Sequence, residues 1–238
     1  MIVFRSWVYS ILFPLWTAVA AIGGIPMLIT QAGALRLIRA WERGVEFLAR
    51  TLVGITYRSE GLENIPDGPC IIAAQHQSSF ETYRLFVELK RPVYVLKKEL
   101  VLIPFVGWFI LRAGLVPIDR KGHAAALRRM LRSAEAAVAR GGQLIIFPEG
   151  TRIAPGVTAP YRPGVAGLYA HLKVPVIPMA LNSGYFWGKT RVRKNPGEIV
   201  FRFLPALPMG LTRDQMMSEL RARIDTAAAD LAPADKAR

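Results

Sequence analysis

An uncharged apolar stretch is the most prominent pattern near the amino terminus. No charged residue occurs between Trp7 and Ile29, and a helix of that length would extend roughly 34 Å, about the thickness of a bilayer's hydrocarbon core. Pro14 and the run from Gly23 to Pro26 interrupt the pattern. A kinked helix, or one that turns back at the glycines, therefore fits as well as a straight span. We expect this segment to enter a membrane.

Arginines at helical spacing follow this run. Between Ala34 and Arg50 they alternate with apolar residues, which is typical of a helix lying on an anionic membrane surface. A helix that covers the protein core is the alternative. The arginines after the apolar run favour a cytoplasmic location for the rest of the chain. A cleaved signal peptide fits less well, because the apolar run continues past the cleavage-like Ala18 to Ala20. The arginines concerned are Arg36, Arg39, Arg43 and Arg50.

Beyond Arg50, short β-branched runs alternate with helical patterns, which is typical of α/β proteins. We predict an α/β fold in which a mostly parallel mixed sheet is flanked by helices. In this prediction residues 1–50 form a membrane-anchoring helical segment and residues 51–238 form the α/β domain. The predicted strands are Gly54 to Arg58, Cys70 to Gln75, Pro92 to Leu96, Leu115 to Ile118, Leu144 to Phe147, Val174 to Met179 and Glu198 to Phe203. The predicted helices are Ser79 to Leu89, Ala124 to Arg140, Val165 to Leu172 and Thr212 to Leu231.

A second apolar stretch runs from Leu100 to Ile118, with Arg112 as its only charge. It is long enough to span a membrane, but its place between two predicted strands argues against a span. We interpret it as an apolar wall that receives a hydrocarbon chain or rests on a bilayer. Ordinary core packing is an equally consistent alternative.

Charge and composition narrow the classes of partner. The 31 Lys and Arg exceed the 17 Asp and Glu and give a formal net charge of +14, which favours negatively charged partners. Mean hydropathy of +0.28 and the lack of zinc-finger or RNP-type motifs argue against nucleic acid, and leave phosphorylated substrates and anionic lipids. Cys70 is the single cysteine, which fits a reducing compartment. The widely separated His and Cys residues predict no metal site, and glycine-rich nucleotide motifs are absent.

His76 and Glu81 are the first candidates for chemistry. His76 follows a predicted strand and Glu81 lies in the first turn of the next helix. The carboxylate can therefore fold back to the imidazole Nδ1 and leave Nε2 as a base. The chain has no Gly-x-Ser-x-Gly motif, so an acceptor hydroxyl deprotonated by His76 could itself attack a thioester. The stretch from Ser78 to Glu81 also matches a capping box, which is an alternative role for Glu81.

A second candidate is the sequence Phe-Pro-Glu-Gly-Thr-Arg from Phe147 to Arg152. It closes a predicted strand, and the carboxyl ends of strands in open α/β sheets commonly carry ligand sites. Arg152 offers a planar fork suited to phosphate, and Glu149 offers an acceptor suited to a hydroxyl. A structural pair between Glu149 and Arg152 that shapes the turn is the alternative.

Four blocks in order resemble those of the glycerolipid acyltransferases, and most closely the 1-acyl-glycerol-3-phosphate (lysophosphatidate) acyltransferases. The Phe-Pro-Glu-Gly-Thr-Arg block matches letter for letter. Glu81 departs from the Asp usual in the first block, and Arg162 stands where Lys is expected before glycine; together these departures fit a subgroup that uses a different acceptor. The blocks are His76 to Glu81, Gly114 to Arg120, Phe147 to Arg152 and Val174 to Pro178.

The resemblance implies transfer of a fatty acyl group from an acyl thioester to the free sn-2 hydroxyl of 1-acyl-glycerol-3-phosphate, forming phosphatidate. It implies that His76 is the general base and that Glu81 is its charge-relay partner. It also implies that the enzyme has no bound cofactor. The donor is acyl-CoA or acyl carrier protein, and the other partners are membrane lipids and the lysophospholipid. An acceptor with an amino-acid headgroup and a non-catalytic lipid-binding protein are the alternatives. The residues implied around the acceptor are Lys97 or Lys98, Arg120, Glu149, Gly150, Thr151 and Arg152.

Overall fold

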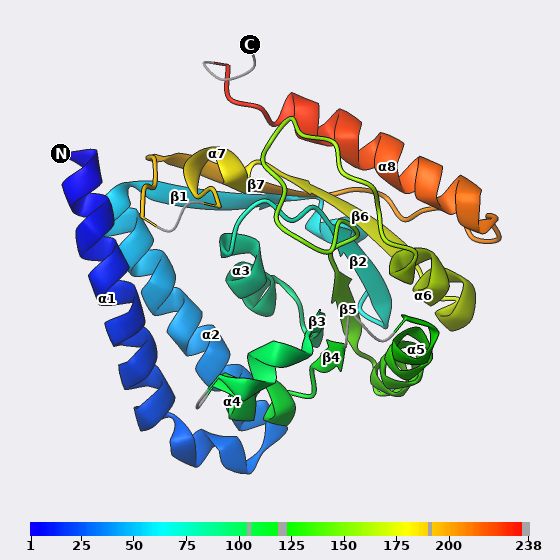
Figure 1. Cartoon of the computed structure of the whole chain (residues 1–238), viewed down its shortest axis with the longest axis horizontal. Helices are drawn as coiled ribbons and strands as arrows, with labels where there is room; N and C mark the ends of the chain where they lie inside the picture. Colours follow the sequence, from blue (N-terminus) through cyan, green and yellow to red (C-terminus); the bar gives the residue numbers. More distant parts are fainter. Residues whose placement is uncertain (104–105, 119–122, 190–191, 235–238) are drawn as a thin grey trace.

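The computed structural model describes residues 1–103, 106–118, 123–189 and 192–234 and is drawn in Figure 1. Its strands are β1 (Ile55–Glu60), β2 (Cys70–Ala74), β3 (Pro92–Lys97), β4 (Val116–Ile118), β5 (Gln143–Ile146), β6 (Val176–Leu181) and β7 (Gly197–Phe203). Its helices are α1 (Ile2–Gly23), α2 (Gln31–Leu48), α3 (Phe80–Glu88), α4 (Val106–Arg112), α5 (His123–Ala139), α6 (Gly164–Leu172), α7 (Ser183–Phe186) and α8 (Arg213–Asp230).

The strands form one seven-stranded sheet in the order β1-β7-β6-β2-β5-β3-β4. All neighbouring pairs are parallel except β6 with β7. The predicted α/β fold with a mostly parallel mixed sheet is therefore confirmed, and each predicted strand overlaps one of these strands. The sequence patterns did not predict α4, which lies within the second apolar stretch, or the single turn of α7.

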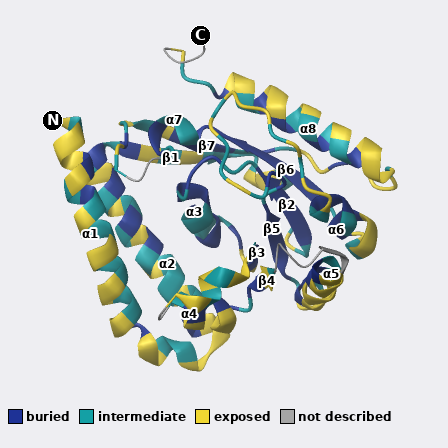
Figure 2. Ribbon diagram, in the orientation of Figure 1, coloured by how far each residue is buried: buried dark blue, intermediate teal, exposed yellow. Residues whose placement is uncertain are grey.

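Helices cover both faces of the sheet. Because side chains alternate along a strand, neighbouring residues of β2 belong to different cores. Ile72 packs in the cluster with α1 to α4, whereas Ile71 packs in the cluster with α5, α6 and α8. Figure 2 shows this central strand as buried throughout. Its position between two helical layers explains its uninterrupted apolar sequence.

The amino-terminal apolar run forms the first arm of a helical hairpin. The chain turns back after α1 at Gly24, where an added Cβ would lie 1.9 Å from Leu37 of α2, so this glycine permits the close approach. The two helices then lie side by side along one edge of the molecule (Figure 1). The sequence was compatible with a straight helix, a kinked helix or a helix that turns back at the glycines. The structure has the helix that turns back. Thr30 caps the returning helix by accepting from Gly33 N at 2.9 Å.

The outer face of α1 is apolar and exposed. An 18-residue window of this 22-residue helix has a mean hydropathy of 1.4, and 11% of that window is buried. Its exposed side chains include Trp7, Ile11, Leu15 and Val19, at 54 to 63% exposure. Figure 2 shows exposed segments, in yellow, along much of α1. An exposed apolar surface of this kind points to membrane association.

The arginines of α2 divide between two environments. Arg39 donates to the carbonyl oxygens of Phe86, Leu89 and Lys90 at 2.9 to 3.0 Å, so it fixes the end of α3 rather than meeting a membrane. Arg36 and Arg43 of α2 are exposed, and so is Arg50, which lies just after the helix. The alternative of a helix that covers the core is thus correct for the inner face of α2. Glu42 of α2 is also buried, and its Oε2 lies 3.2 Å from the Arg84 guanidinium of α3.

Candidate active site

The candidate residues meet at one edge of the sheet. Strands β2, β5 and β3 are consecutive parallel neighbours, so their carboxyl ends lie together. His76 follows β2, Phe147 follows β5, and Lys97 ends β3. This is the edge at which open α/β sheets bind ligands. Two of the sequence blocks, more than 70 residues apart in the chain, therefore form one site.

The imidazole of His76 is held from two sides. Its Nδ1 lies 3.0 Å from Glu81 Oε1, so the backbone turn accommodates the longer side chain of Glu. Its ring stacks on Phe147 with centroids 4.1 Å apart and planes 18° apart. The side chain of His76 remains 16% exposed, and the ring lines a large cavity. A carboxylate on Nδ1 fixes the tautomer that leaves Nε2 able to accept a proton.

Glu81 also organises the start of α3. Its Oε1 accepts from the main-chain nitrogens of Gln77 and Ser78, each at 2.7 Å, and its Oε2 accepts from Ser78 Oγ at 2.8 Å. Ser78 Oγ in turn accepts from Phe80 N at 2.8 Å. The capping alternative is therefore present in modified form, together with the contact to His76. One carboxylate serves both arrangements.

The environment of Glu81 favours its charged form. Burial alone would raise the pKa of this fully buried carboxyl, but the hydrogen bond and charge of His76 and the N–H of Ser78 lower it more, and the net pKa lies below its usual value. Ser183 Oγ of α7 contributes a further hydrogen bond to Glu81 Oε2 at 2.9 Å. Sequence reasoning missed Ser183, which is 102 residues from its partner and lies in no recognisable motif.

The basic candidates lie at the rim of the site. Lys97 lines the cavity and its side chain is 51% exposed, 3.8 Å from Glu99; Lys98 is exposed beside it. Arg152 is half-buried, and its charge lowers the pKa of Tyr83, which also lines the cavity, although burial raises that pKa overall. Arg120 lies outside the described residues.

The turn after β5 sets the direction of the Arg152 segment. Gly150 has φ +68°, a conformation that favours glycine, and its N–H donates to Phe147 O at 2.9 Å. Thr151 is exposed at this turn. The sequence block is therefore a tight turn that follows Phe147, which stacks on His76, and it brings the main chain next to Arg152 to His76, where Ile153 N donates to His76 O at 2.7 Å.

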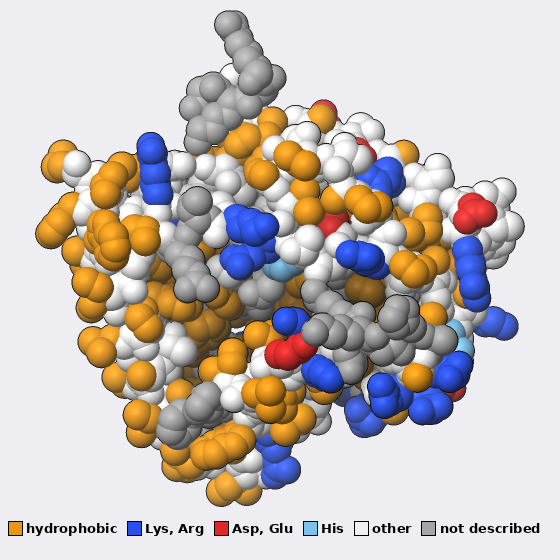
Figure 3. Space-filling model, in the orientation of Figure 1, with side chains coloured by type: hydrophobic (Ala, Val, Ile, Leu, Met, Phe, Trp, Pro, Cys, Tyr) orange, Lys and Arg blue, Asp and Glu red, His pale blue; other side chains and the backbone are white. Residues whose placement is uncertain are grey.

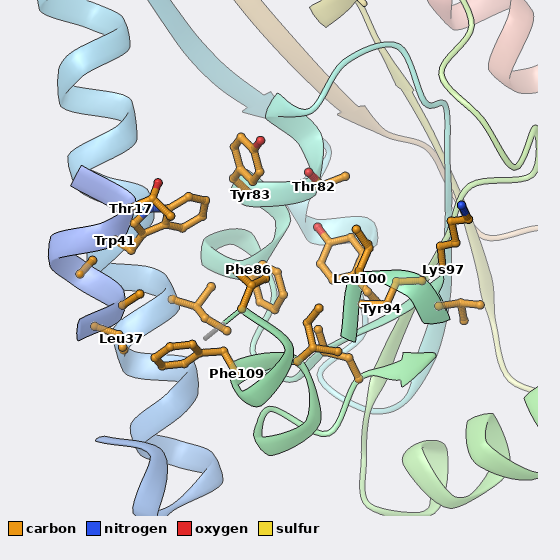
Figure 4. A pocket seen from close by; sticks show the side chains of 18 of the residues that line it. Thr17, Leu37, Trp41, Thr82, Tyr83, Phe86, Tyr94, Lys97, Leu100 and Phe109 are labelled. Carbon is orange, nitrogen blue, oxygen red and sulfur yellow. Dashed lines mark hydrogen bonds between the residues drawn. The ribbon is translucent and has the colours of Figure 1, made fainter. Parts of the chain in front are cut away.

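A cavity of about 330 Å³ extends from His76 into the apolar layer. Figure 4 shows Leu37 and Trp41 of the hairpin opposite Phe86, Leu100 and Phe109, with Lys97 at the edge. Figure 3 shows the same region as a hollow lined with hydrophobic side chains, with Lys and Arg side chains on the surface beside it. The remaining lining residues include Thr17, Ala20, Ala21, Ile38, Val106, Ile110 and Leu115.

The second apolar stretch of the sequence is divided between the core, the cavity lining and the exposed surface. Phe109 and Ile110 are buried in the core and also line the cavity. Trp108 and Leu111 on the other side of α4 are 56 and 57% exposed. The stretch is therefore an apolar wall on its inner side and an exposed apolar surface on its outer side.

Glu149 is not among the residues that line this cavity. It is 8% exposed and lines a separate polar cavity of about 250 Å³ beneath α8, together with Gln77 and Thr158. Its Oε2 is shielded from solvent and has no hydrogen-bond partner among the described residues. Burial raises its pKa to about 7. The structure thus brings His76, Glu81, Lys97 and the Arg152 segment together, whereas Glu149 lines the separate cavity.

No group of three or more His, Cys, Asp or Glu suited to a metal ion occurs in the part of the chain that the structure describes. Cys70 is fully buried, and burial raises the pKa of its thiol to about 12. A thiol in that state is a small core side chain and a poor nucleophile.

The chain resembles known acyltransferases in sequence and fold. The family model described as acyltransferase matches residues 56–182. A 1-acyl-sn-glycerol-3-phosphate acyltransferase of Pseudomonas aeruginosa is 34% identical over 200 residues, 84% of this chain and 78% of that protein. The human 1-acyl-sn-glycerol-3-phosphate acyltransferase alpha is 31% identical over 169 residues, 69% of this chain and 60% of that protein.

A solved structure shares the fold. The crystal structure of the 1-acyl-sn-glycerophosphate (LPA) acyltransferase PlsC from Thermotoga maritima matches with a TM-score of 0.80 and 21% sequence identity, over 97% of this chain and 98% of that chain. The structural match covers nearly the whole chain and so includes the complete sheet. The sequence matches cover the segment that carries His76 and Glu81. The chain belongs to the acyltransferase family that includes the 1-acyl-sn-glycerol-3-phosphate acyltransferases.

Proposed function

We propose that this enzyme transfers a fatty acyl group from an acyl thioester to the free sn-2 hydroxyl of 1-acyl-glycerol-3-phosphate, forming phosphatidate for phospholipid synthesis. The observation that carries the proposal is the His76–Glu81 pair at the mouth of an apolar cavity. A base at that position, next to a space for a hydrocarbon chain and a rim of basic side chains, suits an acceptor that has both an acyl chain and a phosphate. The names of the relatives support the same acceptor.

The chemistry requires one base and no covalent enzyme intermediate. Nε2 of His76 accepts the proton of the acceptor hydroxyl as its oxygen attacks the thioester carbonyl. The tetrahedral intermediate then expels the thiolate, which takes the proton back from the imidazolium. The products are a new ester and a free thiol. Glu81 stabilises the imidazolium that exists between the two proton transfers, as its 3.0 Å contact with Nδ1 allows.

Arg152 and Lys97 are the described candidates for holding the acceptor phosphate. A guanidinium binds phosphate oxygens in pairs, whereas an ammonium acts as a point charge. Lys97 lines the same cavity as His76, and the main chain next to Arg152 is tied to His76, because Ile153 N donates to His76 O at 2.7 Å. From the family resemblance, we assign Lys98, Gly150, Thr151 and Arg120 to acceptor binding as well.

The acyl chain enters the cavity between the hairpin and α4. Its walls are apolar on every side except at His76, Lys97 and a few hydroxyl-bearing side chains, so a hydrocarbon chain gains burial there. Residues 1–50 serve as the membrane anchor in this proposal, with the exposed face of α1 in the cytoplasmic leaflet. Lysolipid could then enter from the bilayer without crossing water.

Contacts between α1 and the rest of the chain support this placement. Arg5 donates to Thr51 O at 3.0 Å, Ser6 Oγ donates to Lys194 O at 3.2 Å, and Tyr9 meets Trp187 edge to face at 5.2 Å. These contacts hold the helix against the sheet domain. They favour a retained anchor over a cleaved signal peptide.

The direct test is release of free thiol by the purified protein in detergent. Supplied with 1-acyl-glycerol-3-phosphate and acyl-CoA, the wild type should release thiol and form phosphatidate, and His76→Ala should not. His171→Ala is the matched control, because His171 is exposed and pairs with Glu135 at 3.3 Å outside the cavity lining. Undiminished turnover in His76→Ala would refute the mechanism.

A substrate panel defines the acceptor and donor. Acyl-CoA and acyl carrier protein should be crossed with lysophosphatidate, lysophospholipids that carry amino-acid headgroups, and monoacylglycerol. Preferred turnover of an amino-acid-headgroup lysolipid would overturn the proposed acceptor. Binding to lipid without turnover of any pair would indicate a non-catalytic lipid-binding protein.

The membrane anchor can be tested separately. A double variant with Ile11→Glu and Leu15→Glu places two charges on the exposed face of α1, where the wild-type side chains are 63 and 60% exposed. Sedimentation with vesicles of phosphatidylcholine and phosphatidylglycerol should show weaker binding, while turnover in detergent persists. Met209→Glu, at a 55% exposed position outside the hairpin, is the control. Unchanged vesicle binding of the double variant would contradict the proposed anchor.

A further inference from the structure

The two carboxylate oxygens of Glu81 have different partners. Oε1 lies 3.0 Å from His76 Nδ1 and accepts from Gln77 N and Ser78 N, each at 2.7 Å. Oε2 accepts from the hydroxyls of Ser78 and Ser183, at 2.8 and 2.9 Å. Of these partners, Ser183 alone comes from a distant part of the chain, 102 residues away. Both Glu81 and Ser183 are fully buried, so water does not compete for this contact.

The direction of the Glu81 carboxylate depends on its contacts, because the terminal torsion of a Glu side chain is soft. This torsion has a broad energy profile, so it does not by itself keep Oε1 opposite His76. The other partners of Glu81 belong to the same turn as His76, at residues 76 to 78, and they move with that turn. A donor on another element is therefore needed to hold the carboxylate relative to the sheet.

Ser183 is such a donor, and its own position is fixed. It follows β6 and begins α7, and β6 is a parallel neighbour of β2, so the carboxyl ends of the two strands lie together. The preceding residue, Asn182, is buried. Its side-chain amide donates to Leu231 O at 3.1 Å, and its Oδ1 accepts from Val200 N at 2.8 Å. Contacts with β7 and the end of α8 therefore support the start of α7.

The same corner of the chain contacts the catalytic turn at two further points. Gly184 N donates to Gln77 Oε1 at 3.0 Å, and Leu181 N donates to Gln75 Oε1 at 3.3 Å. A Cβ added at Gly184 would lie 3.0 Å from the Gln77 side chain, so this glycine permits the close approach. Residues 181–184 thus form a support along the turn that carries the catalytic pair.

We infer that Ser183 is a positioning residue for the acyl transfer, which holds Glu81 Oε2 so that Oε1 remains opposite His76 Nδ1. This inference rests on the proposed function. Ser183 is not among the residues that line the acyl cavity, so it should affect the chemical step and not substrate affinity. The role depends on the length of Glu81, because an Asp, one methylene shorter, could not reach both partners from the same backbone position.

Ser183→Ala removes the donor with little change in volume. With lysophosphatidate and acyl-CoA, its kcat for phosphatidate formation should fall between about 10-fold and 100-fold, the range expected for a hydrogen bond to a charged group. KM for both substrates should stay within about threefold, since the binding contacts remain. Ser183→Cys has a weaker donor of similar size, so its kcat should lie between those of the wild type and Ser183→Ala. Melting temperatures report whether each variant has folded.

The pH profile separates positioning from general damage to the site. A carboxylate that no longer faces Nδ1 stabilises the imidazolium of His76 less well, so the base stays neutral to a lower pH. The acid limb of kcat/KM should therefore move to lower pH in Ser183→Ala. General damage would lower the rate by the same factor at every pH. An acid limb that stays in place or moves to higher pH would overturn the inference.

Combination with Glu81→Asp tests whether Ser183 acts through Glu81. An Asp that keeps its contact with His76 has already lost the contact with Ser183. Adding Ser183→Ala to the Glu81→Asp enzyme should therefore lower kcat by less than about threefold, because the two changes are coupled. Equal losses from Ser183→Ala in the two backgrounds would show that Ser183 acts independently of Glu81, which is contrary to the inference.

Ser6→Ala is the matched control. Ser6 is also fully buried, and its hydroxyl donates to Lys194 O at 3.2 Å, so this variant loses a buried hydroxyl contact away from the catalytic turn. Its kcat, KM and pH profile in detergent should match those of the wild type. Loss of kcat in Ser6→Ala equal to that in Ser183→Ala would refute the role of Ser183.

The remaining outcomes are also decisive. Wild-type kcat in a folded Ser183→Ala enzyme, or a tenfold rise in acceptor KM with kcat retained, would overturn the inference. Should Ser183→Ala have no melting transition, Ser183→Cys decides, and wild-type kcat and an unshifted acid limb in that variant would refute positioning. Absence of phosphatidate formation by the wild type would instead refute the proposed function.

Discussion

Replacement of Glu81 by Gln tests how much the catalytic base depends on its charged partner. Gln can keep the geometry, with its amide oxygen accepting from Gln77 N and Ser78 N. Its NH₂ group would face the hydroxyls of Ser78 and Ser183, which donate to Glu81 Oε2 in the wild type and can turn to accept from an amide. The variant should therefore fold. What it loses is the negative charge opposite the imidazolium.

The magnitude follows from the contact distance. With Glu81 Oε1 3.0 Å from Nδ1, the centres of the two charges lie roughly 4 Å apart, an attraction of about 4 kcal/mol at an effective dielectric constant of about 20. At about 1.4 kcal/mol per tenfold change in rate, this corresponds to a fall in kcat of about 1,000-fold. Partial exposure of His76 to solvent screens the charge, so a loss between about 100-fold and 1,000-fold is expected.

The assay is thiol release with acyl-CoA and lysophosphatidate, alongside the melting temperature. Glu81→Asp keeps the charge but is one methylene shorter, so its kcat should fall between those of the wild type and Glu81→Gln. Glu63→Gln, an exposed site in a short helical turn, is the control and should match the wild type. A folded Glu81→Gln enzyme with kcat within threefold of the wild type would refute the charge-balancing role.

Three further predictions concern the rim, the cavity and the buried acid. Arg152→Lys should raise KM for lysophosphatidate about tenfold, because an ammonium cannot reproduce a paired contact with phosphate. KM for monoacylglycerol should not change. The control Arg129→Lys, at an exposed position on α5, should change neither KM. Ala21→Phe should shift donor preference toward shorter acyl chains, because Ala21 lines the cavity. Ala18→Phe, on the exposed side of the same helix, should leave the preference unchanged. The same chain-length preference in these two variants would contradict the placement of the acyl chain. The pKa of Glu149, raised from 4.5 to about 7, means that the folded state binds the extra proton between these values, so wild-type stability should decline as pH rises through that window by up to about 3 kcal/mol. The gain in melting temperature of Glu149→Gln over the wild type should therefore be larger at pH 8 than at pH 5, and a gain that does not depend on pH would contradict the raised pKa.

The amino-terminal hairpin shows how local and tertiary information divide in this protein. Hydropathy identified the apolar run, and the glycines indicated where it could turn. Neither decided between a span and a hairpin. The decision depends on contacts such as that between Gly24 and Leu37 and on the three carbonyls bonded by Arg39, which exist only once α2 packs on α3.

The sequence by itself determined the elements and pairings that act over short distances. The buried apolar run of β2 predicts a central strand, and the five-residue step from His76 to Glu81 predicts a contact across one turn. Both follow from local geometry, so pattern and spacing suffice. The same holds for the turn at Gly150, whose conformation favours glycine.

Tertiary structure alone decided which distant residues share the site and which way they face. Ser183 reaches Glu81 because β6 lies beside β2 in the sheet, a consequence of strand order that no local pattern encodes. Glu149 belongs to the same six-residue block as Arg152, yet its carboxyl enters the cavity under α8. The side of the sheet to which a loop side chain points depends on the packing of that helix, which is fixed only by contacts between segments far apart in the chain.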